Sequence, residues 1–292
     1  MYTISIISNP NSALLNDRIL STVFKVLDKE NGIKWLMPKV ALEFEVSKYP
    51  EHFKKVWEDL QSLQIDLAIQ NSTGRKKRVL IADMDSTIIH QECIDELASE
   101  YGVGQAVSKI TKKSMNGEIT FEDSLRQRVS LLKGMKAQLI KKVLRNRITY
   151  AAGANALVKT MKFNGCYTAI VSGGFTDFSK IIGERLGFDE NIANKLLLDN
   201  GTLNGFVKEP ILGKSSKVLA MKNISKKLGI EYQDFLAVGD GANDIEMLKL
   251  AGLGVALHAK KVVREAIDVK INFGDLTSLL FLQGYSANEF SV

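Results

Sequence analysis

The sequence has 292 residues, and 45% of them are apolar, which is enough to bury the core of one large domain and a smaller one. The formal net charge of +6 favours anionic partners, although Lys and Arg are spread along the chain rather than gathered in one block. A fibrous protein is excluded, and no uncharged apolar run approaches the roughly 18 residues of a membrane span. Because the N-terminus also lacks the pattern of a secretory signal, we expect a cytoplasmic protein with no membrane partner.

The first seventy residues alternate between β-rich and helical patterns in the order βαββαβ. The β-rich runs and helical stretches are 2–7, 14–27, 33–36, 40–46, 51–63 and 65–69. Such an order packs as a split βαβ sandwich, and it resembles the small ACT-type ligand-sensing domain. We therefore predict an α+β domain over residues 1–72. A docking or dimerisation role without a ligand is the open alternative, and on that interpretation the chain forms a homodimer.

A polar stretch ends this domain and leads into a single basic run, residues 75–78. We interpret residues 73–78 as a solvated linker, with nucleic-acid binding by the basic run as the alternative. The expectation is a hinge and no nucleic-acid partner.

The rest of the chain, residues 79–292, has strand-then-helix units. The runs 79–82, 168–171 and 235–238 are apolar at every position, as in strands that are covered on both faces. The pattern predicts an α/β core with a doubly wound parallel sheet. Residues 91–150 are helical in pattern and too long for a simple crossover, so we predict an inserted helical cap.

The cysteines at positions 93 and 166 lie far apart and have no CxxC spacing. This excludes a disulfide framework and a cysteine zinc site. Both side chains are predicted to be reduced thiols in the core.

Two carboxylates follow the first core strand directly. Residues two apart in an extended chain project to the same side, so Asp83 and Asp85 can share one site at the carboxyl edge of the sheet. Their repulsion favours one ionised and one protonated group, which suits a nucleophile beside a general acid. The alternative is that the pair only caps a turn or binds a structural cation.

Two further segments carry polar side chains beside core strands. Ser172 and Gly173 are expected to end the second strand and open a helix, where a phosphate can rest, although the same motif occurs in ordinary tight turns. Asp240 and Asp244 follow the strand at 235–238 and offer oxygen ligands for magnesium. Asn243 and Asp244 are equally suited to cap the next helix.

A lysine that opens a helical stretch can offset the charge of a reacting phosphate. Lys217 is the first candidate and Lys214 is its rival, while the alternative for either is a solvated helix face.

Together these motifs resemble the haloacid dehalogenase-type phosphatases, and most closely their branch that hydrolyses phosphoserine. The likeness covers roughly residues 75–285. It is carried by the segments 83–87, 92–97, 121–129, 172–175, 239–244 and 258–260. Ala151-Ala152-Gly153 stands where the family often has a Pro-Gly turn, and Lys261 stands where a proline is common.

The resemblance implies a role for each motif residue. Asp83 would become an aspartyl-phosphate, and Asp85 would be the acid and base. The ligands of Mg²⁺ would be Asp83, the main-chain carbonyl of Asp85, and Asp240, with Asp244 close by. The groups that hold the phosphate would be Ser172, Gly173, Lys217 and Asn243.

For the substrate, the resemblance implies O-phospho-L-serine and a place at the last step of serine biosynthesis. Glu92 would attract its ammonium and Arg128 would bind its carboxylate. Met115 and Phe121 would close the cap over it. The alternatives are a phosphatase or phosphotransferase for another small phosphorylated amine or alcohol, and a catalytically silent amino-acid-binding regulator.

Overall fold

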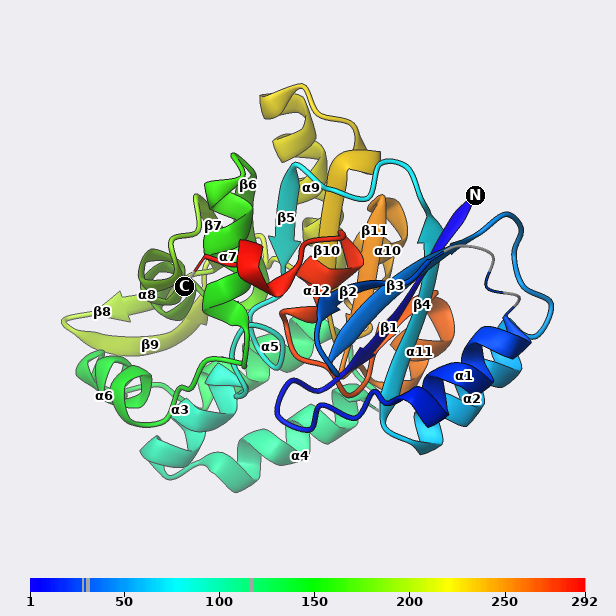
Figure 1. Ribbon diagram of the computed structural model, residues 1–292. Helices are drawn as coiled ribbons and strands as arrows, with labels where there is room; N and C mark the ends of the chain where they lie inside the picture. The colour runs from blue at the N-terminus through cyan, green and yellow to red at the C-terminus, as the bar shows by residue number, and fades with distance from the viewer. Residues whose placement is uncertain (28, 30–31, 116–117, 292) are drawn as a thin grey trace.

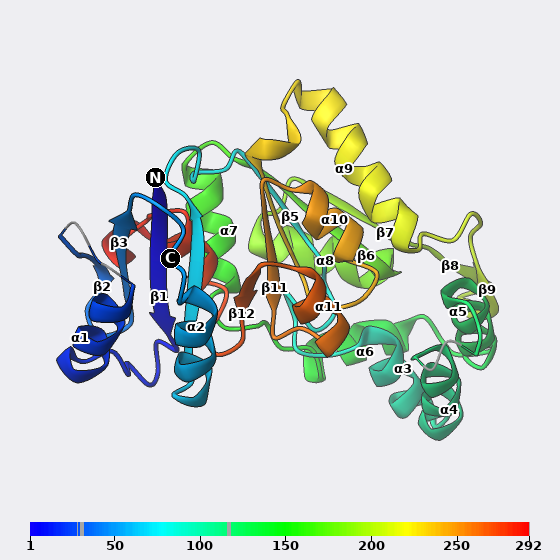
Figure 2. The same cartoon turned by 90° about the vertical axis from the view of Figure 1, so that its right-hand side faces the viewer.

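The computed structural model describes residues 1–27, 29, 32–115 and 118–291. Within these residues the strands form a four-stranded antiparallel sheet, a six-stranded parallel sheet and a two-stranded hairpin. Figures 1 and 2 show the small sheet at one end of the molecule, the parallel sheet in the middle and a group of helices at the other end. The predicted fold class, an α/β core with a small α+β domain, is confirmed.

The small domain has the predicted order of elements. These are β1 (Tyr2–Ser8), α1 (Asp17–Val26), β2 (Lys34–Met37), β3 (Ala41–Val46), α2 (Phe53–Ser62) and β4 (Ile65–Asn71). The strands lie in the order β2-β3-β1-β4. The first helix begins at Asp17 and not at residue 14, because the Asn16 side chain accepts the N–H of Ile19 and caps the helix there.

Both faces of the small sheet are covered. Side chains alternate along β1, so Ile4 and Ile6 pack with the residues of α1 and α2. Ile7 belongs instead to the apolar cluster of the large domain, which includes α12 (Ser278–Leu282). The two domains therefore share a hydrophobic contact and are not joined by the linker alone.

The large sheet has the strand order β12-β11-β10-β5-β6-β7, and every neighbouring pair is parallel. Its strands are β5 (Val79–Ala82), β6 (Tyr167–Phe175), β7 (Glu190–Asn194), β10 (Phe235–Gly239), β11 (Leu253–Leu257) and β12 (Val269–Ile271). The chain runs from β5 outward through β6 and β7, and later from β10 outward through β11 and β12. The order thus reverses at β5, where ligands of such sheets bind beyond the carboxyl ends of the strands.

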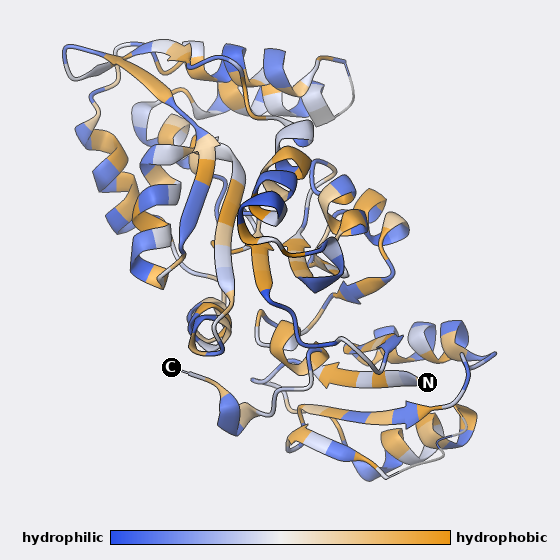
Figure 3. Cartoon of the chain, turned by 90° about the horizontal axis from the view of Figure 1, so that it is seen from above, coloured by the Kyte–Doolittle hydropathy of each residue, from blue (hydrophilic) through white to orange (hydrophobic). Residues whose placement is uncertain are grey.

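Helices cover both faces of this sheet, which explains why its central strands are apolar at every position (Figure 3). Val79 and Ile81 pack on one side against α9 (Lys214–Leu228), α10 (Ile245–Leu250) and α11 (Lys261–Ala266). On the other side Leu80 and Ala82 belong to the cluster that includes α7 and α8. These helices are α7 (Ala154–Phe163) and α8 (Thr176–Leu186).

Four helices occupy the segment predicted to be an inserted cap. They are α3 (Cys93–Tyr101), α4 (Gly104–Met115), α5 (Phe121–Ser130) and α6 (Gln138–Asn146). The cap also has a part that the sequence did not predict, the hairpin of β8 (Leu196–Asp199) and β9 (Thr202–Val207), which packs against α5. Backbone hydrogen bonds between Leu203 and both Gly134 and Met135 join the hairpin to the helical part.

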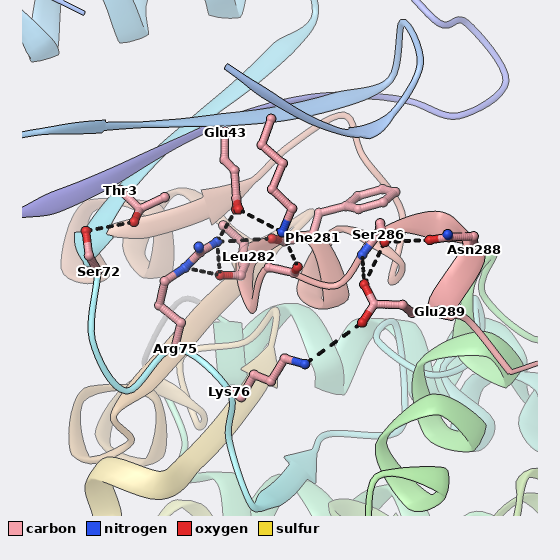
Figure 4. Close-up of polar contacts among 12 residues, drawn as sticks. Thr3, Glu43, Ser72, Arg75, Lys76, Phe281, Leu282, Ser286, Asn288 and Glu289 are labelled. Carbon is pink, nitrogen blue, oxygen red and sulfur yellow. Dashed lines mark hydrogen bonds and ion pairs between the residues drawn. The ribbon is translucent and has the colours of Figure 1, made fainter. Parts of the chain in front are cut away.

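The prediction of a solvated hinge at residues 73–78 was wrong for Arg75 and Lys77, whereas the other four residues of the segment are exposed. Arg75 donates to Glu43 of β3 at 2.6 Å and to the carbonyls of Phe281 and Leu282 in α12 (Figure 4). Lys77 is buried, and its Nζ donates to main-chain carbonyls at 2.7 Å. The basic side chains are thus used to fasten the linker to both domains.

Two smaller predictions concern the whole chain. Cys93 and Cys166 are buried free thiols, as expected. Among the residues that the structure describes, no helix combines the length and apolarity of a membrane span.

Candidate active site

A cavity of about 580 Å³ lies where the carboxyl ends of β5, β6 and β10 meet beneath the cap. The core lines it with predicted site residues from three motifs, and the cap adds others. The lining includes Asp83, Asp85, Glu92, Phe121, Arg128, Ser172, Gly173, Asp240 and Asn243. The parallel sheet explains this convergence, since strands that are far apart in the sequence all end at one edge.

Three carboxylates meet at the floor of the cavity. Ligand oxygens of Asp83, Asp240 and Asp244 all lie within 4.8 Å of one another. Asp244 is fully buried, and its Oδ2 accepts the N–H of Gly241 at 3.0 Å. So close a group of like charges requires cations.

Lys217 supplies one positive charge to this cluster. Its Nζ lies 2.5 Å from Oδ1 of Asp83 and 2.5 Å from Oδ1 of Asp244, and only 2% of the side chain is exposed. Burial alone would lower the pKa of Lys217, but the two carboxylates outweigh it and raise that pKa, so the ammonium stays charged. Burial raises the pKa of Asp83, and the Lys217 ammonium opposes the rise. The alternative of a solvated helix face is wrong for Lys217.

The carboxylate cluster fits a magnesium ion. Three clustered carboxylates exceed the single positive charge of Lys217, and they offer the hard oxygen ligands that Mg²⁺ prefers. Burial raises the pKa of Asp240 to about 6, with Asp244 and Glu92 adding to the rise and Lys260 opposing it. The Asp85 carboxylate is not part of the cluster, so its contribution through a main-chain carbonyl remains a prediction.

Asp85 has the environment of a general acid. Its Oδ1 is buried and has no hydrogen-bond partner among the described residues. Desolvation and then repulsion by Glu92 raise the pKa of Asp85 to about 7. The carboxyl group is therefore partly protonated at neutral pH.

The predicted turn at Ser172 and Gly173 is part of a strand. Strand β6 continues to Phe175, and its register with β7 shifts between Val171 and Phe175 because of the irregular Ser-Gly-Gly segment. Ser172 accepts the N–H of Gly174 at 2.9 Å, which orients the hydroxyl at the cavity wall. Helix α8 begins at Thr176, directly after Phe175, so the segment ends the strand and leads into a helix as predicted, with Ser172 and Gly173 at the bent strand end.

The cap leaves little room for a side chain at Gly173. A Cβ atom built on Gly173 would lie 3.0 Å from Cζ of Phe121, the first residue of α5. The Phe121 ring thus lies directly over the Ser172–Gly174 strand end. Met115 is the last residue of α4, but its side chain lies outside the described residues, so its predicted part in closing the cap is not addressed.

Two further predicted residues lie on the side of α9 and α10. Asn243 lines the cavity, and its neighbour Asp244 directly precedes α10 but makes no side-chain capping hydrogen bond. Lys214, the rival of Lys217, also lines the cavity, yet it is exposed and pairs with Glu246 at 3.3 Å. Of the two lysines, only Lys217 contacts the carboxylate cluster.

Arg128 and Glu92 lie at the cap side of the cavity. Arg128 is only 9% exposed, and its Nε donates to the carbonyl of Ser124 at 3.3 Å. Among the described residues, no carboxylate lies within 4.0 Å of the Arg128 guanidinium, so its other nitrogens face the cavity without an anionic partner. Glu92 is exposed at the rim and accepts from Ser86 at 3.0 Å.

The sequence did not single out three further residues of this cavity. Asp95 lies three residues after Glu92 in α3, and its Oδ1 is buried without a partner among the described residues. Ser124 lies one helical turn before Arg128, and Lys260 follows the end of β11. The helical spacing around Glu92 and Arg128 could have revealed the first two.

Comparison with known proteins agrees with this architecture. A family model described as haloacid dehalogenase-like hydrolase matches residues 80–249, more than half of the chain. The chain belongs to the haloacid dehalogenase-like hydrolases. The matched residues of the chain extend from β5 to α10 and include the whole cap.

Other members of the family are similar over most of the chain. The phosphoserine phosphatase of Haemophilus influenzae is 37% identical over 257 residues, which are 87% of this chain and 80% of that enzyme. A crystal structure of a family hydrolase from Salmonella enterica serovar Typhi has a TM-score of 0.87 at 29% identity and covers 97% of this chain and 98% of that one. A phospho-aspartyl intermediate analogue of a phosphoserine phosphatase is 43% identical, with a TM-score of 0.66, and covers 70% of this chain and 98% of that one.

Proposed function

We propose that this hydrolase is a magnesium-dependent phosphoserine phosphatase, which converts O-phospho-L-serine to L-serine and phosphate. The observation that carries the proposal is a single cavity with Asp83 at its floor and, at its cap side, the Arg128 guanidinium, which forms no ion pair within 4.0 Å among the described residues. A phosphomonoester that also carries a carboxylate matches both ends of this cavity, with the phosphate near Asp83 and the carboxylate near Arg128. The phosphoserine phosphatases among its relatives support the same substrate.

In the first step Asp83 attacks the phosphorus atom. A bond forms between an Asp83 oxygen and phosphorus, the bond from phosphorus to the serine oxygen breaks, and Asp85 gives its proton to that oxygen. The products are free serine and an aspartyl-phosphate. The pKa of about 7 at Asp85 supports this role, because the proton is available at neutral pH.

In the second step water attacks the phosphorus of the aspartyl-phosphate. Asp85, now ionised, accepts a proton from the water, and the bond between Asp83 and phosphorus breaks. This releases phosphate and restores both carboxyl groups to their starting states. The same residue acts as acid and then as base, so one group with an intermediate pKa serves both steps.

Phosphomonoesters hydrolyse so slowly in water that the site must lower the barrier by about 20 kcal/mol or more. Lys217 holds Asp83 in place and contributes positive charge beside the transferred group. Asp83, Asp240 and Asp244 would hold Mg²⁺, which supplies further positive charge for the phosphoryl oxygens when bound. Ser172, Gly173 and Asn243 would donate hydrogen bonds to the phosphate.

Substrate choice would depend on the cap. Arg128 offers a planar pair of donors that matches a carboxylate, and Glu92 at the rim attracts an ammonium. Phe121 closes over the strand end at Gly173 and keeps water from the reacting group. The proposed place is the cytoplasm, at the last step of serine biosynthesis.

The proposal is tested by measuring phosphate release from a panel of phosphomonoesters, with magnesium and after chelation. The panel contains phosphoserine, phosphothreonine, homoserine phosphate and 4-nitrophenyl phosphate. We expect the highest kcat/KM for phosphoserine and no turnover in the chelated protein. A higher kcat/KM for homoserine phosphate would favour the alternative substrate class, and no turnover on any ester would indicate a silent regulator.

Substitutions test the assignment of Arg128 as the group that binds the substrate carboxylate. Arg128→Ala should reduce kcat/KM for phosphoserine by about 100-fold or more, because a charged partner is lost, and should affect 4-nitrophenyl phosphate far less. Arg126→Ala is the matched control, since Arg126 lies on the same helix but is exposed and pairs with Asp123 and Glu209. Equal losses on both substrates would remove Arg128 as the carboxylate site.

A further inference from the structure

The small domain holds one turn of the large domain through a buried carboxylate. Asp66 of β4 is fully buried and accepts three consecutive main-chain N–H groups of the turn that follows β12. Its Oδ1 accepts from Asn272 at 2.8 Å, and its Oδ2 accepts from Phe273 at 3.1 Å and from Gly274 at 2.8 Å. Consecutive amides that converge on one anion fix the shape of a turn.

Two other side chains of the small domain hold the same turn. Asn9 donates to the carbonyl of Phe273 at 3.0 Å. Gln61 accepts from the Asn272 side chain at 2.6 Å. The turn thus belongs to the large domain by sequence, but its position is set by the small one.

On its other side the turn contacts the segment after β11. The carbonyl of Gly274 can only accept, so it must receive the proton of His258 Nε2, which lies 2.7 Å away. The main-chain N–H of His258 donates to Ile271 at 2.8 Å. His258 has a φ of +46°, in the left-handed region that histidine adopts more often than most residues, and these contacts hold it there.

The segment that begins at His258 leads directly to the carboxylate cluster. The N–H of Lys260 donates to the carbonyl of Asp240 at 3.0 Å, and Lys260 Nζ lies 3.8 Å from the Asp240 carboxylate. A continuous series of contacts therefore connects Asp66 in the small domain with Asp240 at the proposed metal site.

We propose that Asp66 and His258 are positioning residues for Asp240. The small domain fixes the turn at residues 272–274, the turn orients His258, and the segment 258–260 holds Asp240 where it can bind a divalent cation. This inference rests on the proposed function for the identity of the ion, but not for the contacts that position Asp240.

A second contact between the domains, at the linker, offers a matched control. Glu43 of β3 is also a buried carboxylate of the small domain, and it pairs with Arg75 beside α12 (Figure 4). That contact joins the domains without reaching Asp240. Glu43→Gln therefore weakens the interface by a comparable change, while Asp66→Asn replaces one of the two oxygens that accept the N–H groups of the turn with an NH2 donor and removes the charge.

A second variant, in the large domain, tests the same series of contacts between Asp66 and Asp240. His258→Asn keeps a residue that tolerates a positive φ, but its shorter side chain cannot reach the carbonyl of Gly274. It leaves the domain interface unchanged. Should Asp66→Asn fail to fold, His258→Asn alone decides the outcome.

The first measurement needs no metal. Amide hydrogen exchange is followed in the metal-free full-length protein on peptides that cover residues 258–260. We expect exchange at Lys260 to be about tenfold faster in Asp66→Asn and His258→Asn, and unchanged in Glu43→Gln. Unchanged exchange at Lys260 in both test variants would overturn the inference.

The second measurement is calorimetric titration of the full-length protein with Mg²⁺. The Kd should rise about tenfold in both test variants and remain within twofold in the control, as for residues that orient metal ligands. An equal rise in Glu43→Gln would mean that the interface acts only through general stability, and would overturn the inference. Wild-type protein that bound no Mg²⁺ would contradict the proposed function, while faster exchange in the variants would still support the positioning of Asp240.

Discussion

Lys217 is the residue on which the electrostatics of the site depend. It is held between Asp83 and Asp244 with almost no access to water, so its charge is available to the reacting group without reorganisation. The same contact fixes the Asp83 carboxylate in one orientation. Asp83, the proposed nucleophile, and the Lys217 ammonium are thus positioned together.

Replacing Asp83 with asparagine separates chemistry from folding. Asp83→Asn keeps the shape of the side chain, but it removes the nucleophilic oxygen anion, so phosphate release should fall by about 10⁴-fold or more. Lys217 retains Asp244 as a partner, and the variant should still unfold in one cooperative transition. Substantial turnover in this variant would contradict covalent catalysis.

The ionisation of Asp85 predicts a pH dependence of the first step. Its pKa is raised to about 7, and the acid form is needed, so the rate of serine release should fall about tenfold per pH unit above pH 7. Rapid-quench measurement of the first turnover isolates this step from hydrolysis of the intermediate. Asp85→Asn should be slow at every pH and should lack this decline, and a decline that persisted would assign it to another group.

At the scale of elements, α5 of the cap lies against the end of β6 in the cavity, where Phe121 faces Gly173. Gly173→Ala would place a methyl group 3.0 Å from the Phe121 ring and push the cap away. We expect kcat/KM to fall by about tenfold or more. Phe121→Leu in the same chain should restore part of it, because the smaller side chain makes room.

A second glycine provides the control for this prediction. A Cβ atom on Gly183 in α8 would meet its neighbours at 3.7 Å or more, which is ordinary contact. Gly183→Ala should therefore leave activity unchanged and slightly increase stability. If Gly173→Ala were equally harmless, the cap would not lie against the strand end during catalysis.

The elements differ in how well their own sequence predicted them. Strand β5 is apolar at all four positions because helices cover it on both faces, so its pattern alone was sufficient. Hairpin β8–β9 was missed because it is mixed in polarity and depends on backbone bonds to Gly134 and Met135, which are distant in the sequence. Strand β12 has three residues, too few for a pattern.

The site shows a similar division. Motif residues that follow strands, such as Asp83 and Asp240, were predictable because the sheet brings strand ends together. The burial of Lys217 was not, since nothing in one basic helix distinguishes a solvated lysine from one that faces two carboxylates. The linker was misjudged for the same reason, because Arg75 and Lys77 contact residues that are distant in the sequence, Glu43 and Gln233.

At the scale of the whole molecule, metal binding should stabilise the fold. Asp83, Asp240 and Asp244 repel one another in the metal-free protein, and Mg²⁺ at 100 times its Kd should add about 2.7 kcal/mol to the free energy of unfolding. Thermal unfolding with and without a chelator measures this change. The Tm of the metal-free protein is the reference.

Asp240→Asn tests the origin of that stabilisation. The variant removes one of the three clustered charges, so its metal-free Tm should be higher than that of the wild type. Its response to Mg²⁺ should be largely lost, because an amide is a weaker ligand than a carboxylate. A full response to Mg²⁺ in Asp240→Asn would place the ion elsewhere.

The cap consists of two parts that leave the core at different points of the chain. The helical part is inserted between β5 and β6 and the hairpin between β7 and α9, and backbone hydrogen bonds at Leu203 join the two. Because both insertions connect the cap to the core, we expect the cap to move less than one that is attached through a single insertion. We therefore expect free phosphorylated metabolites to be better substrates than phosphorylated side chains of folded proteins.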